Sequence, residues 1–226
     1  ISTAGRRSIA GRRLLGKMPR FIEFLVALAG AVIVVPVFML VFLLILSTLG
    51  RPVFFVQTRV GRGTAQFRLV KFRTMSEATG ADGQSLSDDL RVTPVTRLVR
   101  RLRLDEIPQL WMILRGDMAL VGPRPLLAQT IAGFGAAGIE RCRVRPGLTG
   151  WAQVSGNSFL TNEEKLDLDL WYIANRSLAL DLRILFETVR VALFGEVRSP
   201  ERLAEAASFR ARTAGGMLEA HPRGPL

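Results

Sequence analysis

The chain has 226 residues and a formal net charge of +12, with 31 Lys and Arg residues against 19 Asp and Glu residues. A chain of this length can bury a sizeable core, and its charge suits an anionic partner such as membrane lipid, nucleotide phosphates or nucleic acid. The single cysteine, Cys142, excludes an intrachain disulfide, and the single histidine, His221, argues against a Ser-His-Asp triad or a histidine-ligated zinc. Any catalysis therefore has to use carboxylates, hydroxyls, lysine, arginine and a hard metal ion.

The N-terminal part of the chain combines a basic tail with a long apolar run. Residues 1–20 are polar and basic, and we expect this tail to lie against anionic lipid. The run from Phe24 to Leu49 contains no charged residue and exceeds the roughly 20 residues that a helix needs to cross a bilayer. It is also too long for a secretory signal. We therefore predict a membrane helix over residues 21–50.

Pro36 and the flanking charges predict how this helix enters the membrane. A proline near the middle of a helix removes a backbone hydrogen bond and kinks the helix. Basic residues crowd both flanks of the apolar run, and the positive-inside rule prefers both on the cytoplasmic side. This pattern favours a re-entrant helix that breaks at Pro36 and returns to the face it entered, with a kinked single span as the alternative.

Two short segments after the apolar run predict a β-hairpin. Val53–Val60 and Gln66–Thr74 are rich in β-branched and aromatic residues, and they flank the turn sequence Gly61-Arg62-Gly63. The simplest interpretation of Lys71, in the second segment, is a charged residue that faces outward from a strand. Residues 76–88 contain several Gly, Ser and Asp residues and predict a mobile loop.

The next segment predicts a helix with a basic face. Thr93 and Pro94 are typical of an N-cap and a first helical residue, and apolar residues at helical spacing follow them. Arg97, Arg100 and Arg101 share another face of the same helix. A solvated basic face is the plain explanation of such a run, but this one leads directly into two acidic residues.

The adjacent carboxylates Asp105 and Glu106 are the strongest candidates for chemistry. We predict that Asp105 caps a second helix, Glu106–Leu114, where the helix dipole and the neighbouring arginines would keep this carboxylate ionised. A capping aspartate followed by a first-turn glutamate is the structural alternative. A site that handles phosphates over a metal ion needs both carboxylates and guanidinium groups, and the density of both in residues 97–125 favours such a site.

The C-terminal half is predicted to be mainly helical. We expect a helix over Leu126–Arg143 with a weak break near Gly133–Gly138, and a second helix capped by Asn162. A last helix carries an apolar stripe, which is more typical of a core than of a membrane contact. The stripe consists of Leu182, Leu185, Phe186, Val189 and Leu193. Residues 196–226 are rich in Ala, Arg and Gly and predict a disordered tail.

Several motifs in order resemble one known family. RRLRLDEIPQLWMILRGDMALVGPRP, KFRTM, VRPGLTGWAQVSG and LDLWYIANRSLALDLRILFET resemble the signatures of the bacterial sugar transferases. These proteins are also called monotopic phosphoglycosyl transferases or polyprenyl-phosphate hexose-1-phosphate transferases. The resemblance covers roughly residues 20–194. It implies a mostly α fold with small β elements: a re-entrant membrane helix followed by a cytoplasmic catalytic domain, residues 51–195, at the bacterial inner (plasma) membrane.

The resemblance also implies a reaction and its partners. A sugar-1-phosphate would pass from a nucleotide-sugar donor, expected to be UDP-linked, to a polyprenyl phosphate acceptor such as undecaprenyl phosphate, and UMP would leave. Asp105 would attack the phosphorus that is bonded to the sugar, so that a covalent intermediate forms. Glu106 would assist it, and Asp105 and Glu106 would hold Mg²⁺. The implied product serves exopolysaccharide, capsule, O-antigen or glycan assembly. The resemblance leaves the oligomeric state undecided between a monomer and a homo-oligomer.

The same resemblance assigns further residues to the substrate. Arg124, Arg145 and the pair Arg100 and Arg101 would stabilise the charge on the transferring phosphoryl group, with Lys71 in the floor of the site. Arg73 of KFRTM would share that floor. Trp151 and Gln153 are candidates to contact a nucleotide base, although a buried tryptophan is the more frequent explanation.

The chain departs from the family pattern at several places, among them Glu23, where relatives often carry aspartate, and Thr96, where they often carry glycine. Val35-Pro36 stands where Ser-Pro is usual at the helix break, and Arg103 replaces a common Ser or Thr. Asn157 follows Ser155-Gly156 where relatives often carry arginine, which puts a contact made by that arginine in doubt. None of these changes removes a carboxylate that the implied mechanism needs.

Two alternatives belong to other classes of protein. The net charge permits a membrane-anchored basic module that binds nucleic acid or acidic lipid without catalysis. Aromatic residues interleaved with arginines, expected for single-strand stacking, are absent between Arg91 and Arg103, and we therefore expect no nucleic-acid partner. An inactive relative that acts as a scaffold is the second alternative, and the intact pair Asp105-Glu106 argues against it.

Overall fold

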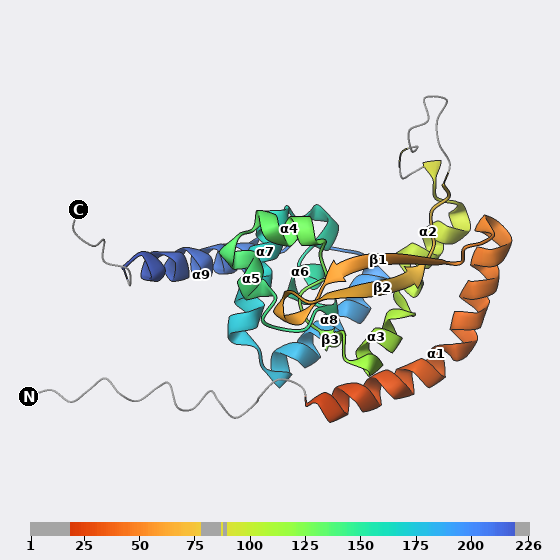
Figure 1. The fold of residues 1–226 in the computed structure, drawn as a ribbon, viewed down its shortest axis with the longest axis horizontal. Coiled ribbons are helices and arrows are strands. Elements are labelled where there is room, and N and C mark those ends of the chain that lie inside the picture. Colours follow the sequence, from red (N-terminus) through yellow and green to blue (C-terminus); the bar gives the residue numbers. More distant parts are fainter. Residues whose placement is uncertain (1–18, 78–86, 88–89, 220–226) are drawn as a thin grey trace, which may run out of the picture.

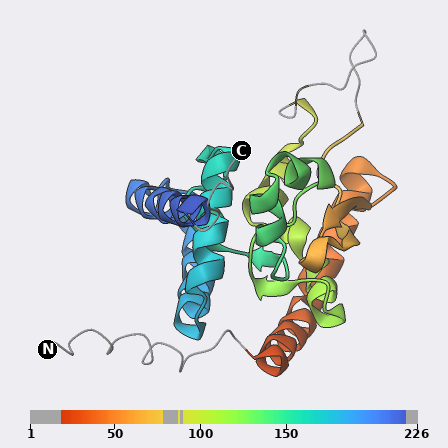
Figure 2. The same cartoon turned by 60° about the vertical axis from the view of Figure 1, so that its left-hand side comes forward.

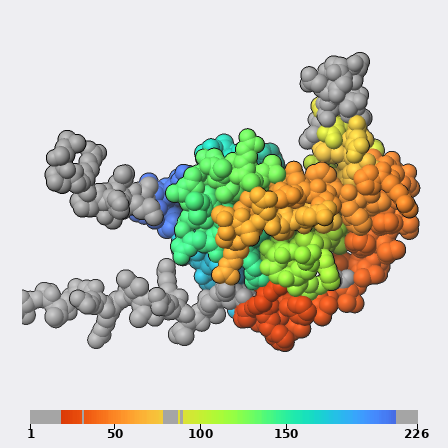
Figure 3. Space-filling view, in the orientation of Figure 1, coloured from red at the N-terminus to blue at the C-terminus, as the bar shows by residue number. Residues whose placement is uncertain are grey.

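The first helix forms one edge of the molecule. The structure is a computed structural model that describes residues 19–77, 87 and 90–219. Helix α1 (Arg20–Leu49) contains Pro36 and bends along its course, so that it follows the lower and right-hand edges of the body in Figures 1 and 3. Its Val32–Leu49 part is long and apolar enough to cross a membrane, and only 11% of this part is buried inside the protein. An apolar helix that exposes most of its surface suits a membrane anchor.

Packing and a helix cap attach the C-terminal half of α1 to the rest of the chain. In the C-terminal half, Val41 and Ile45 are buried against Phe72 and Val99. Arg73 donates hydrogen bonds to the carbonyls of Leu49, at 2.6 Å, and Gly50, at 3.0 Å, so it caps the C-terminus of α1. Helix C-terminal carbonyls lack partners inside the helix and favour a cation. Arg73, which the family resemblance assigned to the floor of the site, therefore has a structural role here, and it does not line the pocket that contains Asp105 and Glu106.

The predicted hairpin is confirmed. Strands β1 (Phe54–Val60) and β2 (Gln66–Phe72) pair antiparallel with Phe54 opposite Phe72, and a 3-10 turn, η2 (Arg62–Thr64), joins them. Gly63 in this turn has a φ of 63°, a conformation that glycine adopts without strain. A second small sheet is parallel, formed by β3 (Ala119–Val121) and β4 (Gly147–Thr149).

The helix with the basic face also forms as predicted. Helix α2 (Pro94–Arg101) has Thr93 as its N-cap, and the Thr93 hydroxyl accepts a hydrogen bond from the amide of Thr96. The next prediction is wrong. Asp105 does not cap an α-helix; it lies in a 3-10 turn, η4 (Leu104–Glu106), and helix α3 (Gln109–Arg115) begins only after Pro108. Proline restricts the residue before it and offers no N–H, which delays the start of the regular helix.

Short helices fill the next part of the chain. The predicted break near Gly133–Gly138 is confirmed, because α4 (Ala128–Gly133) ends there and α5 (Ala136–Arg141) begins. The later elements are α6 (Trp151–Val154), η5 (Asn157–Phe159), α7 (Asn162–Asn175) and α8 (Leu178–Phe194). The cap of α7 is Thr161, one residue before the predicted Asn162.

The pattern of the apolar stripe on α8 suggested a core position, but most of the stripe is exposed. Phe186 is 75% exposed, and Leu182, Val189 and Leu193 are exposed as well, whereas Leu185 is half-buried. The buried face of α8 instead presents Ile184 and Asp181. Amphipathic periodicity shows that a helix has two unlike faces, but the tertiary packing decides which face the protein covers.

The prediction of a disordered tail over 196–226 is wrong for most of that range. Residues 200–219 form helix α9, which packs against α7, and Figure 2 shows α7, α8 and α9 grouped on the side of the body opposite α1. Ala206 is buried there, and Arg210 pairs with Asp167 at 2.6 Å. Alanine and arginine are strong helix formers, so low hydrophobicity did not prevent order once ion pairs anchored the helix. The predictions for residues 1–18 and for most of 76–88 concern parts of the chain outside the described residues.

Candidate active site

The two candidate catalytic carboxylates lie together in a polar pocket. Asp105 and Glu106 are each 7% exposed, and they sit on η4, which contacts both α1 and β2. The pocket has a volume of about 450 Å³. Its charged lining comes from β2, from α2, from η4, from the turn after β3 and from the end of α8. These residues are Lys71, Arg100, Arg101, Arg103, Asp105, Glu106, Arg124 and Glu196.

Glu106 is held by arginine on two sides. Arg124 donates a hydrogen bond from Nη2 to Glu106 Oε1 at 2.7 Å, and Arg103 Nη1 lies 3.9 Å from Glu106 Oε2. Burial by itself would lower the pKa of Arg124, but the adjacent Glu106 carboxylate raises it above its usual value. The Glu106 carboxylate thus favours the charged form of the Arg124 guanidinium.

A second layer of residues fixes Arg124. Arg141 donates a hydrogen bond to the Arg124 carbonyl at 2.5 Å, and its guanidinium forms a buried ion pair with Asp169 at 2.8 Å. Gly122, two residues earlier, permits the close approach of β3 and β4, because a Cβ there would lie 2.6 Å from the Arg145 carbonyl. Sequence reasoning missed Arg141 and Asp169, since neither belongs to a recognisable local pattern.

Asp105 differs from its neighbour in having no such partner. In the described part of the chain Glu106 makes ion pairs, whereas Asp105 makes none. Burial, together with the charge of Glu106, raises the pKa of Asp105 to about 6, and Lys71 and Arg100 oppose this rise. The prediction that arginines favour the ionised form holds for Arg100, but burial and the charge of Glu106 outweigh it, and the expected α-helix N-terminus is absent because Asp105 lies in a 3-10 turn. With this pKa, roughly a tenth of the Asp105 carboxyls would be protonated at pH 7.

The cations assigned to the site divide into two groups. Lys71, Arg100, Arg101 and Arg124 line the pocket with the acid pair. Burial lowers the pKa of Lys71, which the carboxylates of Asp105 and Glu106 partly counteract. A pocket that holds this many cations around two carboxylates suits an anionic ligand.

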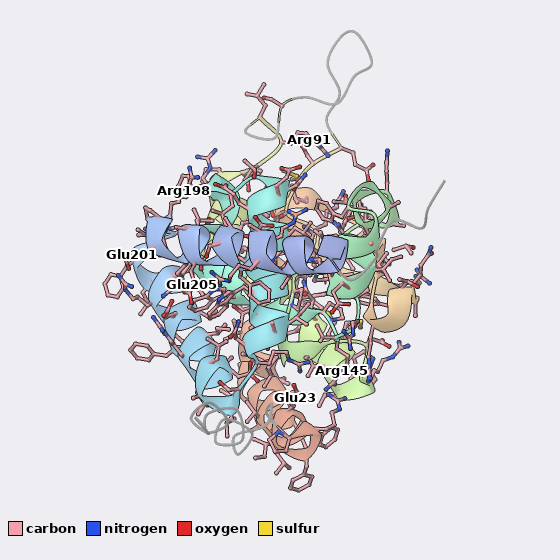
Figure 4. All side chains as sticks on the ribbon, turned by 90° about the vertical axis from the view of Figure 1, so that its left-hand side faces the viewer. Glu23, Arg91, Arg145, Arg198, Glu201 and Glu205 are labelled. Atoms are coloured by element: carbon pink, nitrogen blue, oxygen red, sulfur yellow. The ribbon has the colours of Figure 1, made fainter. Side chains whose placement is uncertain are left out.

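Arg145 is not brought to this pocket. Its Nη2 forms an ion pair with Glu23 of α1 at 2.8 Å, and its Nη1 donates to the Met118 carbonyl at 3.3 Å. Figure 4 shows Glu23 and Arg145 next to each other, and both line a separate small pocket. The structure thus gives Arg145 a role in docking the N-terminal end of α1, in place of the predicted contact with the transferring phosphate.

Trp151 is a buried core residue and does not contact the pocket of the acid pair. It is 3% exposed, and its ring stacks on Trp171 with centroids 5.3 Å apart. Gln153 is buried too, and its Nε2 donates to the Leu148 carbonyl at 3.0 Å. Neither side chain lines the pocket of the acid pair, whereas Asn157, Ser158 and Glu196 do, and sequence reasoning did not assign them.

The acid pair fits a magnesium ion of the kind that arrives with a phosphate substrate. No group of three or more His, Cys, Asp or Glu residues that could hold a metal ion occurs among residues 19–77, 87 and 90–219. Mg²⁺ is commonly held by one or two carboxylates together with substrate phosphates and water. Asp105 and Glu106 offer carboxylate oxygens at the wall of the pocket, which meets that requirement.

The raised pKa of Asp105 makes a prediction about stability. The native state binds the Asp105 proton more tightly than the unfolded chain does, in which the pKa of this carboxyl is 3.8. Ionisation of Asp105 therefore lowers the free energy of unfolding as the pH rises from about 4 to 6. Asp105→Asn removes the charge and should raise that free energy by about 1–3 kcal/mol at pH 7.5. The gain should shrink towards pH 4. Thermal unfolding in detergent at pH 4.5, 6.0 and 7.5 measures it.

Asp117→Asn is the matched control for this experiment. Asp117 pairs with Arg115 at 3.4 Å, and its side chain is 30% exposed, so its removal should give no comparable gain. A stability difference between wild type and Asp105→Asn that does not change with pH would contradict the assignment.

Comparison with known proteins places the chain in a family. The model of the family described as "Bacterial sugar transferase" matches residues 15–195. The chain is 46% identical over 148 residues to the uncharacterized sugar transferase EpsL of Bacillus subtilis, covering 66% of this chain and 73% of that protein. It is 34% identical over 197 residues to the exopolysaccharide production protein ExoY of Rhizobium meliloti, covering 80% of this chain and 87% of that protein.

A third relative has a name that states its substrates. The chain is 41% identical over 152 residues to the UDP-N-acetylgalactosamine-undecaprenyl-phosphate N-acetylgalactosaminephosphotransferase of Aeromonas hydrophila. The match covers 64% of this chain and 36% of that protein, so the chain spans about a third of the length of this relative. Taken with the match to the family model, these relatives show that the chain belongs to the bacterial sugar transferase family and is an enzyme of the phosphoglycosyl transferase class.

Proposed function

We propose that this protein transfers a sugar-1-phosphate from a UDP-linked sugar to a polyprenyl phosphate such as undecaprenyl phosphate, with release of UMP. The observation that carries the proposal is the buried pair Asp105 and Glu106 inside a pocket lined by cations. The names of relatives support the substrate classes, since the Aeromonas protein is named for a UDP-sugar and undecaprenyl phosphate. Relatives named for exopolysaccharide production support a role in the initiating step of exopolysaccharide, capsule, O-antigen or glycan assembly.

The nucleophile in this proposal is Asp105. One of its oxygens attacks the phosphorus bonded to the sugar, and the bond from that phosphorus to the UMP oxygen breaks, so that UMP leaves with the electron pair. An oxygen of the polyprenyl phosphate then attacks the same phosphorus and frees the Asp105 carboxylate. Two features of Asp105 support the assignment: it makes no ion pair within the described residues, and a pKa of about 6 leaves it largely ionised at neutral pH.

The neighbours of Asp105 have complementary roles. Glu106, held by Arg124 at 2.7 Å, would accept the proton of the incoming lipid phosphate or help to hold Mg²⁺ together with Asp105. Bound there, the ion would neutralise the charge of the diphosphate. Lys71, Arg100 and Arg101 lie in the same pocket and would stabilise the charge that develops on the transferring phosphoryl group.

A membrane location follows from the acceptor and from α1. The polyprenyl chain resides in the bilayer, and η4 packs directly against α1, so the acid pair lies close to the apolar helix. We therefore propose a monotopic protein whose α1 enters and leaves the inner membrane on the cytoplasmic face, with the catalytic domain on that face. The bend of α1 in Figure 1 and Pro36 within it support the re-entrant form over a straight span.

The covalent route predicts a burst of UMP. A panel of UDP-sugars, tested with membranes and undecaprenyl phosphate, first identifies the donor. Purified protein given this donor alone should then release UMP in proportion to enzyme, because the first bond exchange needs no lipid. Asp105→Asn should abolish the burst, and Asp117→Asn should leave it intact. Glu106→Gln should chiefly slow turnover.

Mass spectrometry decides the same question independently. A phosphosugar adduct on the peptide that contains Asp105 supports the covalent route. If neither burst nor adduct appears under conditions where turnover is verified, the sugar phosphate passes directly between substrates and Asp105 is not the nucleophile.

The proposed magnesium ion predicts a dependence on divalent cations. Excess chelator should reduce transfer at least a hundredfold, and added Mg²⁺ should restore it, because the ion offsets charge on the diphosphate. Transfer rates measured in metal-depleted buffer with increasing Mg²⁺ test this. Undiminished activity in excess chelator would refute the metal requirement.

The re-entrant topology predicts that both ends of α1 face the same side. In a Cys142→Ala background, a cysteine at Ser8 and a cysteine at Arg68, which is exposed on β2, should be labelled by a membrane-impermeant maleimide from the same side of sealed vesicles. Pro36→Leu should straighten the helix and move the N-terminus across. Labelling of the two positions from opposite sides in the parent protein would establish a simple span.

A further inference from the structure

A carboxylate just beyond the family match forms part of the wall of the active-site pocket. Glu196 is one residue past the matched range 15–195, and it follows Gly195, which ends α8 with a φ of 92°. Its Oε1 accepts hydrogen bonds from Arg103 Nη2 at 3.0 Å and from Asn157 Nδ2 at 2.8 Å. Its Oε2 accepts from the Ser158 amide at 2.9 Å and from the Ser158 hydroxyl.

These contacts join three segments that are distant in the sequence. Arg103 lies two residues before Asp105 and has a φ of 55°, while Asn157 and Ser158 begin η5. All of them line the pocket that holds Asp105 and Glu106. Because each oxygen of Glu196 already accepts two hydrogen bonds, this carboxylate has little capacity left for a ligand. Its geometry therefore indicates a positioning role and not a catalytic one.

Glu196 also balances the charge of Arg103. The guanidinium of Arg103 lies 3.0 Å from Glu196 and 3.9 Å from Glu106, so Glu196 is its nearer carboxylate. Without Glu196, Glu106 would be the remaining carboxylate that pairs with Arg103 in the described residues. Arg103 would then move towards the acid pair and compete with Arg124, with a metal ion or with the substrate phosphate.

The segment that carries Glu196 is itself held on both sides. The amide of Gly195 donates to the Val191 carbonyl at 2.9 Å, and the amide of Ser199 donates to the Ser155 carbonyl at 3.1 Å. Further along, the guanidinium of Arg202 lies 4.1 Å from the ring centre of Trp151. The C-terminal segment thus docks firmly enough to hold Glu196 against η5.

We propose that Glu196 is a positioning residue of the donor site, which fixes η5 at the mouth of the pocket and holds Arg103 away from the acid pair. The segment after the family match would then complete the pocket that receives the sugar and phosphates of the nucleotide sugar. This inference rests on the proposed function for its kinetic consequence, but the contacts can be tested without turnover.

Glu196→Gln tests the proposal because it removes the charge and keeps the size. Loss of a charged acceptor should free the Ser158 amide, so hydrogen exchange over residues 155–160 should become at least about ten times faster. The KM for the donor should rise about tenfold, while kcat changes by less than about threefold, since the nucleophile is intact. Glu196→Asp keeps the charge and should recover part of the loss in KM.

Glu205→Gln is the matched control, because it removes the same charge from the same C-terminal segment. Glu205 lies on α9, where it is exposed (Figure 4). It should change neither exchange nor kinetics. Unchanged exchange, or faster exchange with an unchanged KM, in Glu196→Gln would overturn the proposal. If wild-type protein transfers no sugar phosphate from any donor, the proposed function fails. Hydrogen exchange over residues 155–160 in Glu196→Gln then decides the positioning role by itself. Faster exchange supports that role, and unchanged exchange overturns it.

Discussion

The burial of two neighbouring carboxylates on one short turn is the constraint on which the site depends. Removing a carboxylate from water costs free energy unless cations or hydrogen-bond donors compensate. Glu106 receives that compensation from Arg124 and, at longer range, from Arg103. Asp105 makes no ion pair within the described residues, and burial, together with the charge of Glu106, raises its pKa. Two chemically similar groups therefore have different surroundings: Glu106 is held by arginines, and Asp105 makes no ion pair within the described residues.

Much of the surrounding structure serves to keep those cations in place. The buried pair Arg141 and Asp169 holds the backbone of Arg124, and Glu196 holds Arg103. The hairpin delivers Lys71 to the same pocket. These fixed partners connect segments that lie far apart in the chain, and they limit how far the guanidinium groups of Arg103 and Arg124 can move when a phosphate binds.

The first helix is attached to this site by polar contacts at both ends. Near its start, Glu23 pairs with Arg145, and Arg20 donates to the carbonyls at the C-terminus of α3. At its end, Arg73 caps the last carbonyls. Apolar contact alone would leave a helix free to slide along its neighbour, whereas these directional bonds fix its register relative to η4. These contacts therefore hold the apolar surface of α1 at a fixed position relative to Asp105 and Glu106.

The sequence by itself determined the elements whose cause is local. An uncharged apolar run, a Thr-Pro cap and two β-rich segments around a Gly-Arg-Gly turn predicted α1, α2 and the hairpin, because chain length, capping and turn chemistry act within a few residues. The family, the acid pair and the cluster of Lys71, Arg100, Arg101 and Arg124 were also predicted, since their residue types are dictated by chemistry.

Only the tertiary structure decided which charge faces which. The sequence placed Arg145 with the phosphates, but it pairs with Glu23, which lies 122 residues away in the chain. The same holds for Glu196, which reaches Arg103 across 93 residues. The exposed stripe of α8 and the order of α9 depend on neighbours in the same way. Electrostatic partners and buried faces are set by distances through space, and a pattern of residues along the chain does not contain those distances.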